Sequence, residues 1–186
     1  MLASPKDAVI PLKSGMPDLA AALEGPGLEV DVVEPVPGRP SLIARIDGSD
    51  PDAPSLCLLG HTDVVPADPA GWSFDPFGGD VVGGEVRGRG AVDMLNQTAA
   101  MALTLRRLAD EGFRPRGSVI YWAVPDEECG GHQGARLVLE RWPELVRSTA
   151  TITEVGGARI DTPRGPIVEA YPAEKGSGGL AITVGC

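Results

Sequence analysis

The chain has 186 residues, with 26 acidic side chains against 16 basic ones and a formal net charge of −10 at pH 7. This balance argues against the clustered Lys and Arg surface that nucleic acids require, so we expect no nucleic acid partner. No uncharged apolar run approaches the roughly 18 residues of a membrane span, and the first residues lack a signal peptide's apolar stretch. We therefore expect no membrane partner and a cytoplasmic location.

Short apolar runs alternate with helical patterns, and Gly- and Pro-rich turns separate them. In chain order, the predicted elements are a helix over 17–24, strands over 28–33, 42–46 and 56–60, a small hairpin over 81–86, a helix over 94–110, a strand over 118–124, a helix over 133–141 and a strand over 150–153. The runs over 56–60 and 118–124 are apolar throughout, which is typical of strands covered on both faces. The order predicts an α/β fold with a mostly parallel or mixed sheet flanked by helices.

Polar side chains follow three of these strands at the point where each strand ends. They are His61 and Asp63 after the first, Asp126, Glu127 and Glu128 after the second, and Glu154 after the third. Asp93 lies in the Gly-rich segment before the long helix. Because the carboxyl ends of parallel strands share one edge of a sheet, where ligands bind, we expect these side chains to converge on one site.

A cluster of one imidazole and several carboxylates suits a divalent ion such as zinc, cobalt or manganese. A carboxylate such as Asp93 can bridge two ions about 3.5–4 Å apart, and such a pair polarises a carbonyl and activates water. Asp63 stands two residues after His61, where its carboxylate can accept the second imidazole N–H. Glu127 and Glu128 point to different sides of an extended backbone, so one can bind metal while the other acts as a base.

Four motifs carry a resemblance to a known family: HTDVVP at 61–66, GRGAVDM at 88–94, PDEECGG at 125–131 and TEVGG at 153–157. In order and spacing they resemble the co-catalytic zinc metallopeptidases and amidohydrolases that include carboxypeptidase G, acetylornithine deacetylase, succinyl-diaminopimelate desuccinylase and aminoacylase. The resemblance covers roughly residues 20–175. It implies a zinc-exopeptidase-like fold in which a smaller lid domain interrupts the metal-binding domain and usually mediates dimerisation.

The resemblance also implies roles for the clustered side chains. His61, Asp93 and Glu154 would bind one ion, and Asp93 would bridge to a second ion that Glu128 also binds. Glu127 would be the general base, Asp63 would orient His61, and the peptide bond after Asp93 would be cis. The implied reaction is hydrolysis, by metal-activated water, of an amide or peptide bond in small N-acyl amino acid or peptide substrates.

The end of the chain departs from the family pattern. Residues 1–172 are predicted to be a partial catalytic domain, and 173–186 the start of the crossing to a lid domain that is absent here, together with the C-terminal part. The family's last metal-binding histidine has no counterpart, so we expect at most one tightly bound zinc ion, with cobalt or manganese as substitutes. The alternative hypothesis is a truncated, catalytically incompetent metal-binding fragment. Neither the substrate-binding residues nor the homodimer surface of the family is predicted here.

The second histidine and the cysteines receive ordinary interpretations. Cys129 and His132 have the spacing of half a zinc site, but no second Cys/His pair completes it, so we interpret His132 as a polar residue near a helix start. The three cysteines, Cys57, Cys129 and Cys186, do not form a disulfide framework, because an odd number leaves at least one thiol free.

Overall fold

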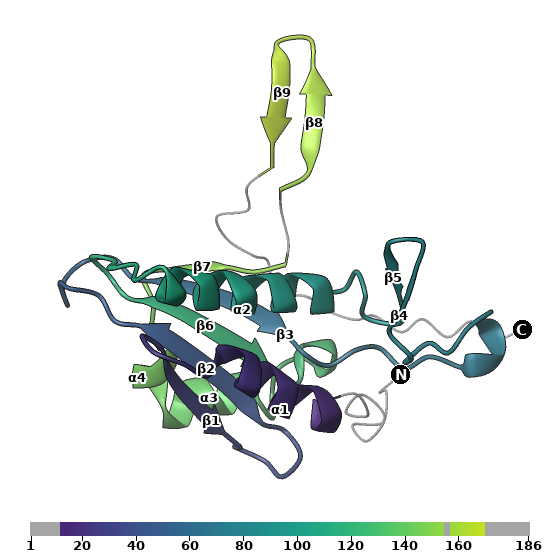
Figure 1. Ribbon diagram of the computed structural model, residues 1–186, viewed down its shortest axis with the longest axis horizontal. Coiled ribbons are helices and arrows are strands. Elements are labelled where there is room, and N and C mark those ends of the chain that lie inside the picture. Colours follow the sequence, from purple (N-terminus) through teal and green to yellow (C-terminus); the bar gives the residue numbers. More distant parts are fainter. Residues whose placement is uncertain (1–11, 155–156, 170–186) are drawn as a thin grey trace, which may run out of the picture. The chain divides into compact units, whose positions relative to one another are not determined.

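The computed structural model describes residues 12–154 and 157–169, and the chain divides into two units on either side of Glu154 and Val155. The helices of the first unit are α1 (Leu12–Leu23), α2 (Leu95–Asp110), α3 (Ala135–Arg141) and α4 (Pro143–Val146) (Figure 1). Its strands are β1 (Glu29–Val33), β2 (Ser41–Ile46), β3 (Leu56–His61), β4 (Asp80–Val82), β5 (Glu85–Arg87), β6 (Val119–Val124) and β7 (Ala150–Ile152). Each of these elements overlaps its predicted range except α4, for which no helix was predicted from the sequence.

A five-stranded sheet with the order β1-β2-β6-β3-β7 forms the centre of the first unit. β3 pairs in parallel with both β6 and β7, whereas β2 pairs antiparallel with β1 and β6. The register places His61, the last residue of β3, opposite Val124, the last residue of β6. The predicted mixed sheet of an α/β fold is therefore confirmed, and the carboxyl ends of β3, β6 and β7 share one edge.

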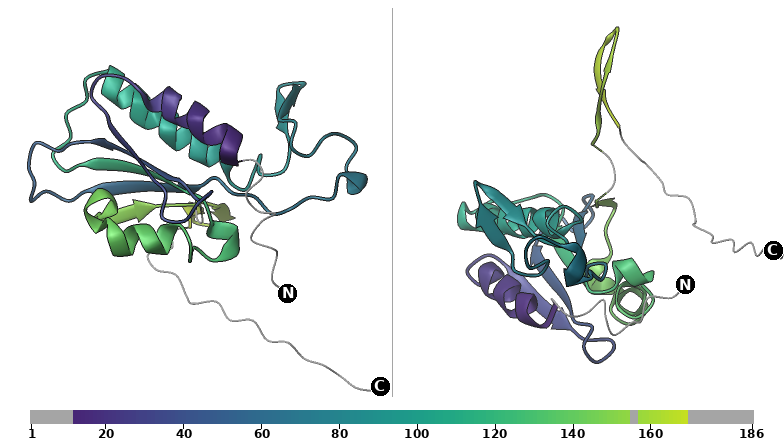
Figure 2. Two further views of the ribbon diagram at one scale, coloured as in Figure 1. Left: turned by 90° about the horizontal axis from the view of Figure 1, so that it is seen from below. Right: turned by 90° about the vertical axis from the view of Figure 1, so that its right-hand side faces the viewer.

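Helices cover both faces of this sheet, with α1 and α2 on one face and α3 and α4 on the other (Figure 2). β6 contributes to both cores because successive side chains of a strand point to opposite faces. Tyr121 packs in the core under α1 and α2, together with Leu23 and Leu105, and the neighbouring Trp122 packs with Val138 and Val146 in the other core. This double burial explains the uniformly apolar sequence of β6.

Three features differ from the sequence prediction or lie beyond it. α1 begins at Leu12, five residues before the predicted start. A hairpin of β8 (Arg159–Thr162) and β9 (Gly165–Val168) was not predicted; its two-residue turn is closed by Thr162, whose hydroxyl donates to the carbonyl of Gly165 at 2.7 Å. The predicted domain boundary at residues 172 and 173 lies outside the described residues. Among the described helices, none has the length and apolar character to cross a membrane.

Gly60 allows helix α2 to pack closely on strand β3, just before His61. A Cβ atom at Gly60 would lie 2.7 Å from the hydroxyl oxygen of Thr98 on α2, and that hydroxyl donates to the carbonyl of His61 at 2.7 Å. We expect Gly60→Ala to lower the free energy of unfolding by about 1–3 kcal/mol, because overpacking displaces the helix. Urea denaturation measures the effect. Gly71→Ala is the matched control, since nothing lies within 4 Å of its Cβ position; equal losses in both variants would contradict this packing role.

Candidate metal centre

The predicted site residues come together at the shared carboxyl edge of β3, β6 and β7. His61 ends β3, Glu154 follows β7 by two residues, and Glu127 and Glu128 lie in the short 3-10 helix η3 (Glu127–Cys129) after β6. Asp93 lies just before α2, and its peptide bond to Met94 is cis, as predicted. Parallel pairing explains this convergence, because it directs the loops after all three strands to one edge.

Asp63 is fully buried and connects His61, at the end of β3, to the acidic pair Glu127 and Glu128 after β6. The Nδ1 atom of His61 lies 2.8 Å from the backbone carbonyl of Asp63 and 3.5 Å from its carboxylate. The carboxylate instead accepts the backbone N–H groups of Glu127 and Glu128, each at 3.1 Å. The sequence assigned the orienting contact to the carboxylate; in the structure the nearer group is the carbonyl, and the carboxylate positions the acidic pair.

The Nε2 atom of His61 faces the carboxylates of the site. It lies 3.1 Å from Asp93 Oδ1, 3.2 Å from Glu154 Oε2 and 4.0 Å from Glu127 Oε2. The ring is 1% exposed, whereas the side chain of Asp93 is 70% exposed and that of Glu127 is 48% exposed. The imidazole therefore forms the buried floor of the site, and the carboxylates form its open rim.

Three pKa values at this site are shifted by the crowding of these groups. Burial lowers the pKa of His61, but hydrogen bonds and the charge of Asp63, followed by Asp93, outweigh it and raise the pKa to about 10. Burial and the charge of Glu154 raise the pKa of Glu127, and burial and the charge of Asp93 raise that of Glu128. The carboxylates around this one imidazole therefore repel one another, and a bound divalent cation would relieve that repulsion.

The donor set and one orphaned atom fit a bound cation. Glu154 Oε2 is buried and has no hydrogen-bond partner among the described residues, although it lies 3.2 Å from His61 Nε2. His61, Asp93 and Glu154 each offer one ligand atom, all within 4.8 Å of one another. Because Nδ1 is engaged by Asp63, Nε2 remains for a cation. One nitrogen and two carboxylate oxygens suit zinc and also cobalt or manganese.

A second group of three potential ligands is formed by His61, Glu127 and Glu128. It uses the same imidazole as the first group, so the two groups compete for one nitrogen. Asp93 and Glu128, the pair assigned to a second ion from the sequence, do not belong to a common group of three among the described residues. His132 is exposed and belongs to neither group, in accord with its ordinary interpretation.

Asp126 is a positioning residue that the sequence analysis placed near the site without assigning it a role. It is 1% exposed, and its carboxylate accepts the backbone N–H groups of Gln133 and Gly134 at 2.7 Å and of Ala135 at 3.0 Å. It thereby joins η3, which carries the acidic pair, to the start of α3. The available signal was an Asp seven residues before the predicted helix over 133–141, which is too distant for an ordinary N-cap.

Asp126→Asn is expected to lower the free energy of unfolding by about 2–4 kcal/mol, because hydrogen bonds to a buried charged group are strong and an amide cannot accept all three donors. Chemical denaturation provides the measurement. Asp110→Asn is the control. Asp110 forms an ion pair with Arg106, but its side chain is 62% exposed, and exposed ion pairs contribute at most about 1 kcal/mol. A loss at Asp126 no larger than at Asp110 would argue against the anchoring role.

The model of Peptidase family M20/M25/M40 matches residues 57–181, which include all the candidate site residues. The chain is 39% identical over 143 residues to the succinyl-diaminopimelate desuccinylase of Methylocella silvestris, covering 74% of this chain and 36% of the relative. It is 34% identical over 151 residues to the N-fatty-acyl-amino acid synthase/hydrolase of Xenopus tropicalis, covering 79% of this chain and 30% of the relative.

Solved structures show the same fold. A metallo-carboxypeptidase of the M20 family from Sulfolobus solfataricus superposes with a TM-score of 0.61 at 23% identity, covering 84% of this chain and 33% of that one. Human carnosine dipeptidase 1 superposes with a TM-score of 0.57 at 24% identity, covering 76% and 31%. The chain thus spans about a third of the length of the relatives it matches. On the family match over residues 57–181, the chain belongs to peptidase family M20/M25/M40.

Proposed function

We propose that this protein is a zinc-dependent hydrolase that cleaves an amide or peptide bond in small N-acyl amino acids or peptides. The observation that carries the proposal is the approach of His61 Nε2, Asp93 and Glu154 to within the reach of one cation. Family membership supports hydrolysis, and the desuccinylase and acyl-amino acid hydrolase among the relatives support N-acyl amino acids as the substrate class.

Zinc held by His61, Asp93 and Glu154 would polarise the scissile carbonyl and acidify water. Glu127 is the residue we assign as general base, because its half-exposed carboxylate lies beside this ligand group, 4.0 Å from Nε2 of His61. Burial is the main cause that raises the pKa of Glu127, and a raised pKa favours a base that can both accept a proton and return it to the leaving amine. Asp63 accepts two backbone N–H groups of η3 and so positions Glu127 relative to His61, and Asp126, just before η3, bonds to the start of α3.

The direct test is metal-dependent hydrolysis by the purified chain. Zinc-loaded protein is assayed for amine release from N-acetyl and N-succinyl amino acids and from dipeptides, then again after chelation and after zinc is restored. Hydrolysis that disappears with chelation and returns with zinc supports the proposal. Zinc binding with no hydrolysis of any of these substrates would favour the alternative, a metal-binding fragment that is catalytically incompetent on its own.

At most one zinc ion is expected to bind tightly to each chain, because both ligand groups depend on the single Nε2 atom of His61. Elemental analysis after gel filtration in metal-free buffer gives the stoichiometry. Two ions per chain retained through this step would contradict the expectation, unless a partner chain supplies a further imidazole.

We further propose a cytoplasmic location, which the free thiols of Cys57 and Cys129 support.

A further inference from the structure

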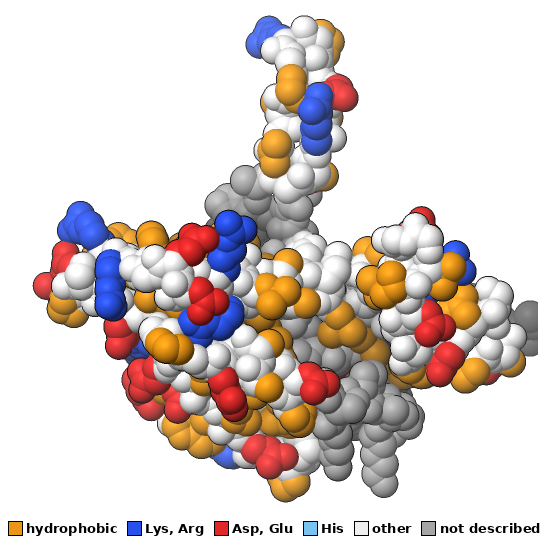
Figure 3. Space-filling view, viewed as in Figure 1, with side chains coloured by type: hydrophobic (Ala, Val, Ile, Leu, Met, Phe, Trp, Pro, Cys, Tyr) orange, Lys and Arg blue, Asp and Glu red, His pale blue; other side chains and the backbone are white. Residues whose placement is uncertain are grey.

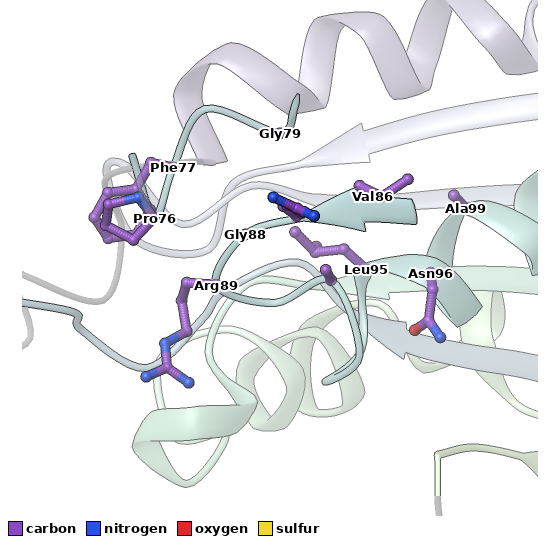
Figure 4. A pocket seen from close by; sticks show the side chains of 11 residues that line it. Pro76, Phe77, Gly79, Val86, Gly88, Arg89, Leu95, Asn96 and Ala99 are labelled. Carbon is purple, nitrogen blue, oxygen red and sulfur yellow. The ribbon is translucent and has the colours of Figure 1, made fainter. Parts of the chain in front are cut away.

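A cavity of about 310 Å³ lies between the loop before β4, strand β5 and the first turns of α2. Figure 4 shows Pro76 and Phe77 on one side of it and Val86, Leu95 and Ala99 on the other. Its volume lies at the lower end of the range of ligand pockets, which is about 300–1,000 Å³. The cavity can therefore hold a small ligand group.

The wall of this cavity is continuous with the loop that carries Asp93. Ala91 and Leu95 line the cavity and stand two residues before and two residues after Asp93. With consecutive Cα atoms about 3.8 Å apart, neither wall residue lies more than about 7.6 Å from Asp93 between Cα atoms. The backbone N–H of Leu95 donates to the carbonyl of Gly90 at 2.9 Å, which closes the turn. The cavity therefore shares its wall with the loop that carries a candidate metal ligand, although Asp93 itself does not line it.

The chemistry of the wall favours an uncharged, apolar occupant. Two arginines line the cavity, but the Arg89 guanidinium stacks on Trp72 at 5.4 Å and that of Arg87 on Phe74 at 5.9 Å. Figure 4 shows the Arg89 side chain directed away from Val86 and Leu95. The amide of Asn96 also lines the cavity, and the remaining wall is mostly apolar, with Phe77, Val86 and Leu95 as its larger side chains. A carboxylate would gain few polar partners there, whereas a hydrocarbon would lose its contact with water.

The same region exposes apolar side chains to solvent. Phe77 is 42% exposed and Val86 61%, and Val81 at the start of the hairpin is 71% exposed. Figure 3 shows such apolar side chains on the β4–β5 hairpin, at the right of the view. An exposed apolar patch beside a polar site commonly marks a surface that binds a ligand.

We propose that this cavity binds the apolar acyl group of the substrate, which deepens and rests on the proposed hydrolase function. In an N-acyl amino acid the charge belongs to the amino-acid half, whose carboxylate needs polar partners. A hydrocarbon acyl group, unlike a succinyl group, carries no polar group beyond the scissile carbonyl. It therefore matches a wall whose two arginines lie over aromatic rings, which leaves Asn96 as the remaining polar side chain. The cavity beside Asp93 thus selects substrates with a medium-length apolar acyl group over acetyl or charged acyl groups.

The test compares hexanoate with acetate, two carboxylates that differ only in the apolar chain. Dissociation constants for both are measured by NMR titration of the zinc-loaded protein. Wild-type protein is expected to bind hexanoate at least about tenfold more tightly than acetate, since each buried methylene contributes favourably. A ratio near one in the wild type would overturn the proposal.

Two neighbouring alanines on α2 provide a matched pair of variants. Ala99 lines the cavity and Ala100 does not, and both are exposed. Ala99→Phe is expected to bring the hexanoate-to-acetate ratio close to one, whereas Ala100→Phe retains the wild-type ratio. Phe77→Ser, which removes part of the wall, is expected to lower the ratio about threefold or more. A wild-type ratio in Ala99→Phe would overturn the assignment.

The outcome separates this inference from the proposed function. If the protein hydrolyses N-acyl amino acids but kcat/KM is the same for acetyl and hexanoyl substrates in wild type and in Ala99→Phe, the acyl site is wrong and the hydrolase stands. If no substrate is hydrolysed, but Ala99→Phe still weakens hexanoate binding tenfold in the presence or absence of zinc, the cavity binds acyl chains and the hydrolase function is wrong.

Discussion

Replacing Glu127 with Gln is expected to reduce amide hydrolysis about 10²–10⁴-fold, the usual contribution of a positioned general base. The amide keeps the size of the side chain but cannot accept a proton from water. Zinc content is expected to stay at the wild-type level, because His61, Asp93 and Glu154 form their ligand group without Glu127. Steady-state kinetics and elemental analysis of the same preparation measure both quantities.

The control for Glu127 is Glu140→Gln. Glu140 is an exposed residue of α3 that pairs with Arg136 at 2.8 Å, so its replacement leaves the site intact. Wild-type kinetics in this control and a large loss at Glu127 would identify a local effect. Activity retained in Glu127→Gln would exclude Glu127 as the base and direct attention to Glu128, the other acidic residue of η3 held by Asp63.

Replacing His61 with Ala is expected to weaken zinc binding by more than about 100-fold. Loss of a partner that merely orients a ligand costs 10–100-fold in metal affinity, and His61 is a candidate ligand common to both groups of three. Competition with a chromophoric chelator measures the dissociation constant. His132→Ala serves as the matched control, because it removes the chain's other imidazole from an exposed position outside both groups.

The two histidine variants together give a clear result in either direction. Zinc affinity lost in His61→Ala and retained in His132→Ala would support the site at the strand ends. Equal losses would indicate a general effect of the substitution, and loss only in His132→Ala would place the metal near Cys129. Far-UV circular dichroism of both variants separates loss of a ligand from loss of the fold.

The fold class and the convergence of the site could be predicted from the sequence because burial leaves a strong pattern. β6 is apolar throughout since it contributes Tyr121 to one core and Trp122 to the other, and the polar residues after β3, β6 and β7 mark where those strands end. The α2 helix was equally clear, because its apolar stripe is long enough to show the helical period.

The finer contacts could not be predicted because they depend on distances across the fold. Nothing in the spacing of His61 and Asp63 distinguishes a carbonyl contact from a carboxylate contact, since both belong to the same residue. The bonds from Asp126 to the start of α3 require a turn whose shape the sequence does not specify. The β8–β9 hairpin, with only four residues in each strand, carries too short an alternation to stand out.

Asp63 bonds to some residues of the site and not to others. Its carbonyl contacts His61 and its carboxylate accepts both backbone N–H groups of the acidic pair, so these bonds couple the end of β3 to the loop after β6. Asp93, by contrast, reaches the cluster only through His61 among the described contacts, and its side chain is 70% exposed. A cation bound to His61 and Asp93 would therefore find the imidazole already fixed, and the exposed Asp93 side chain would lose more freedom on binding than His61.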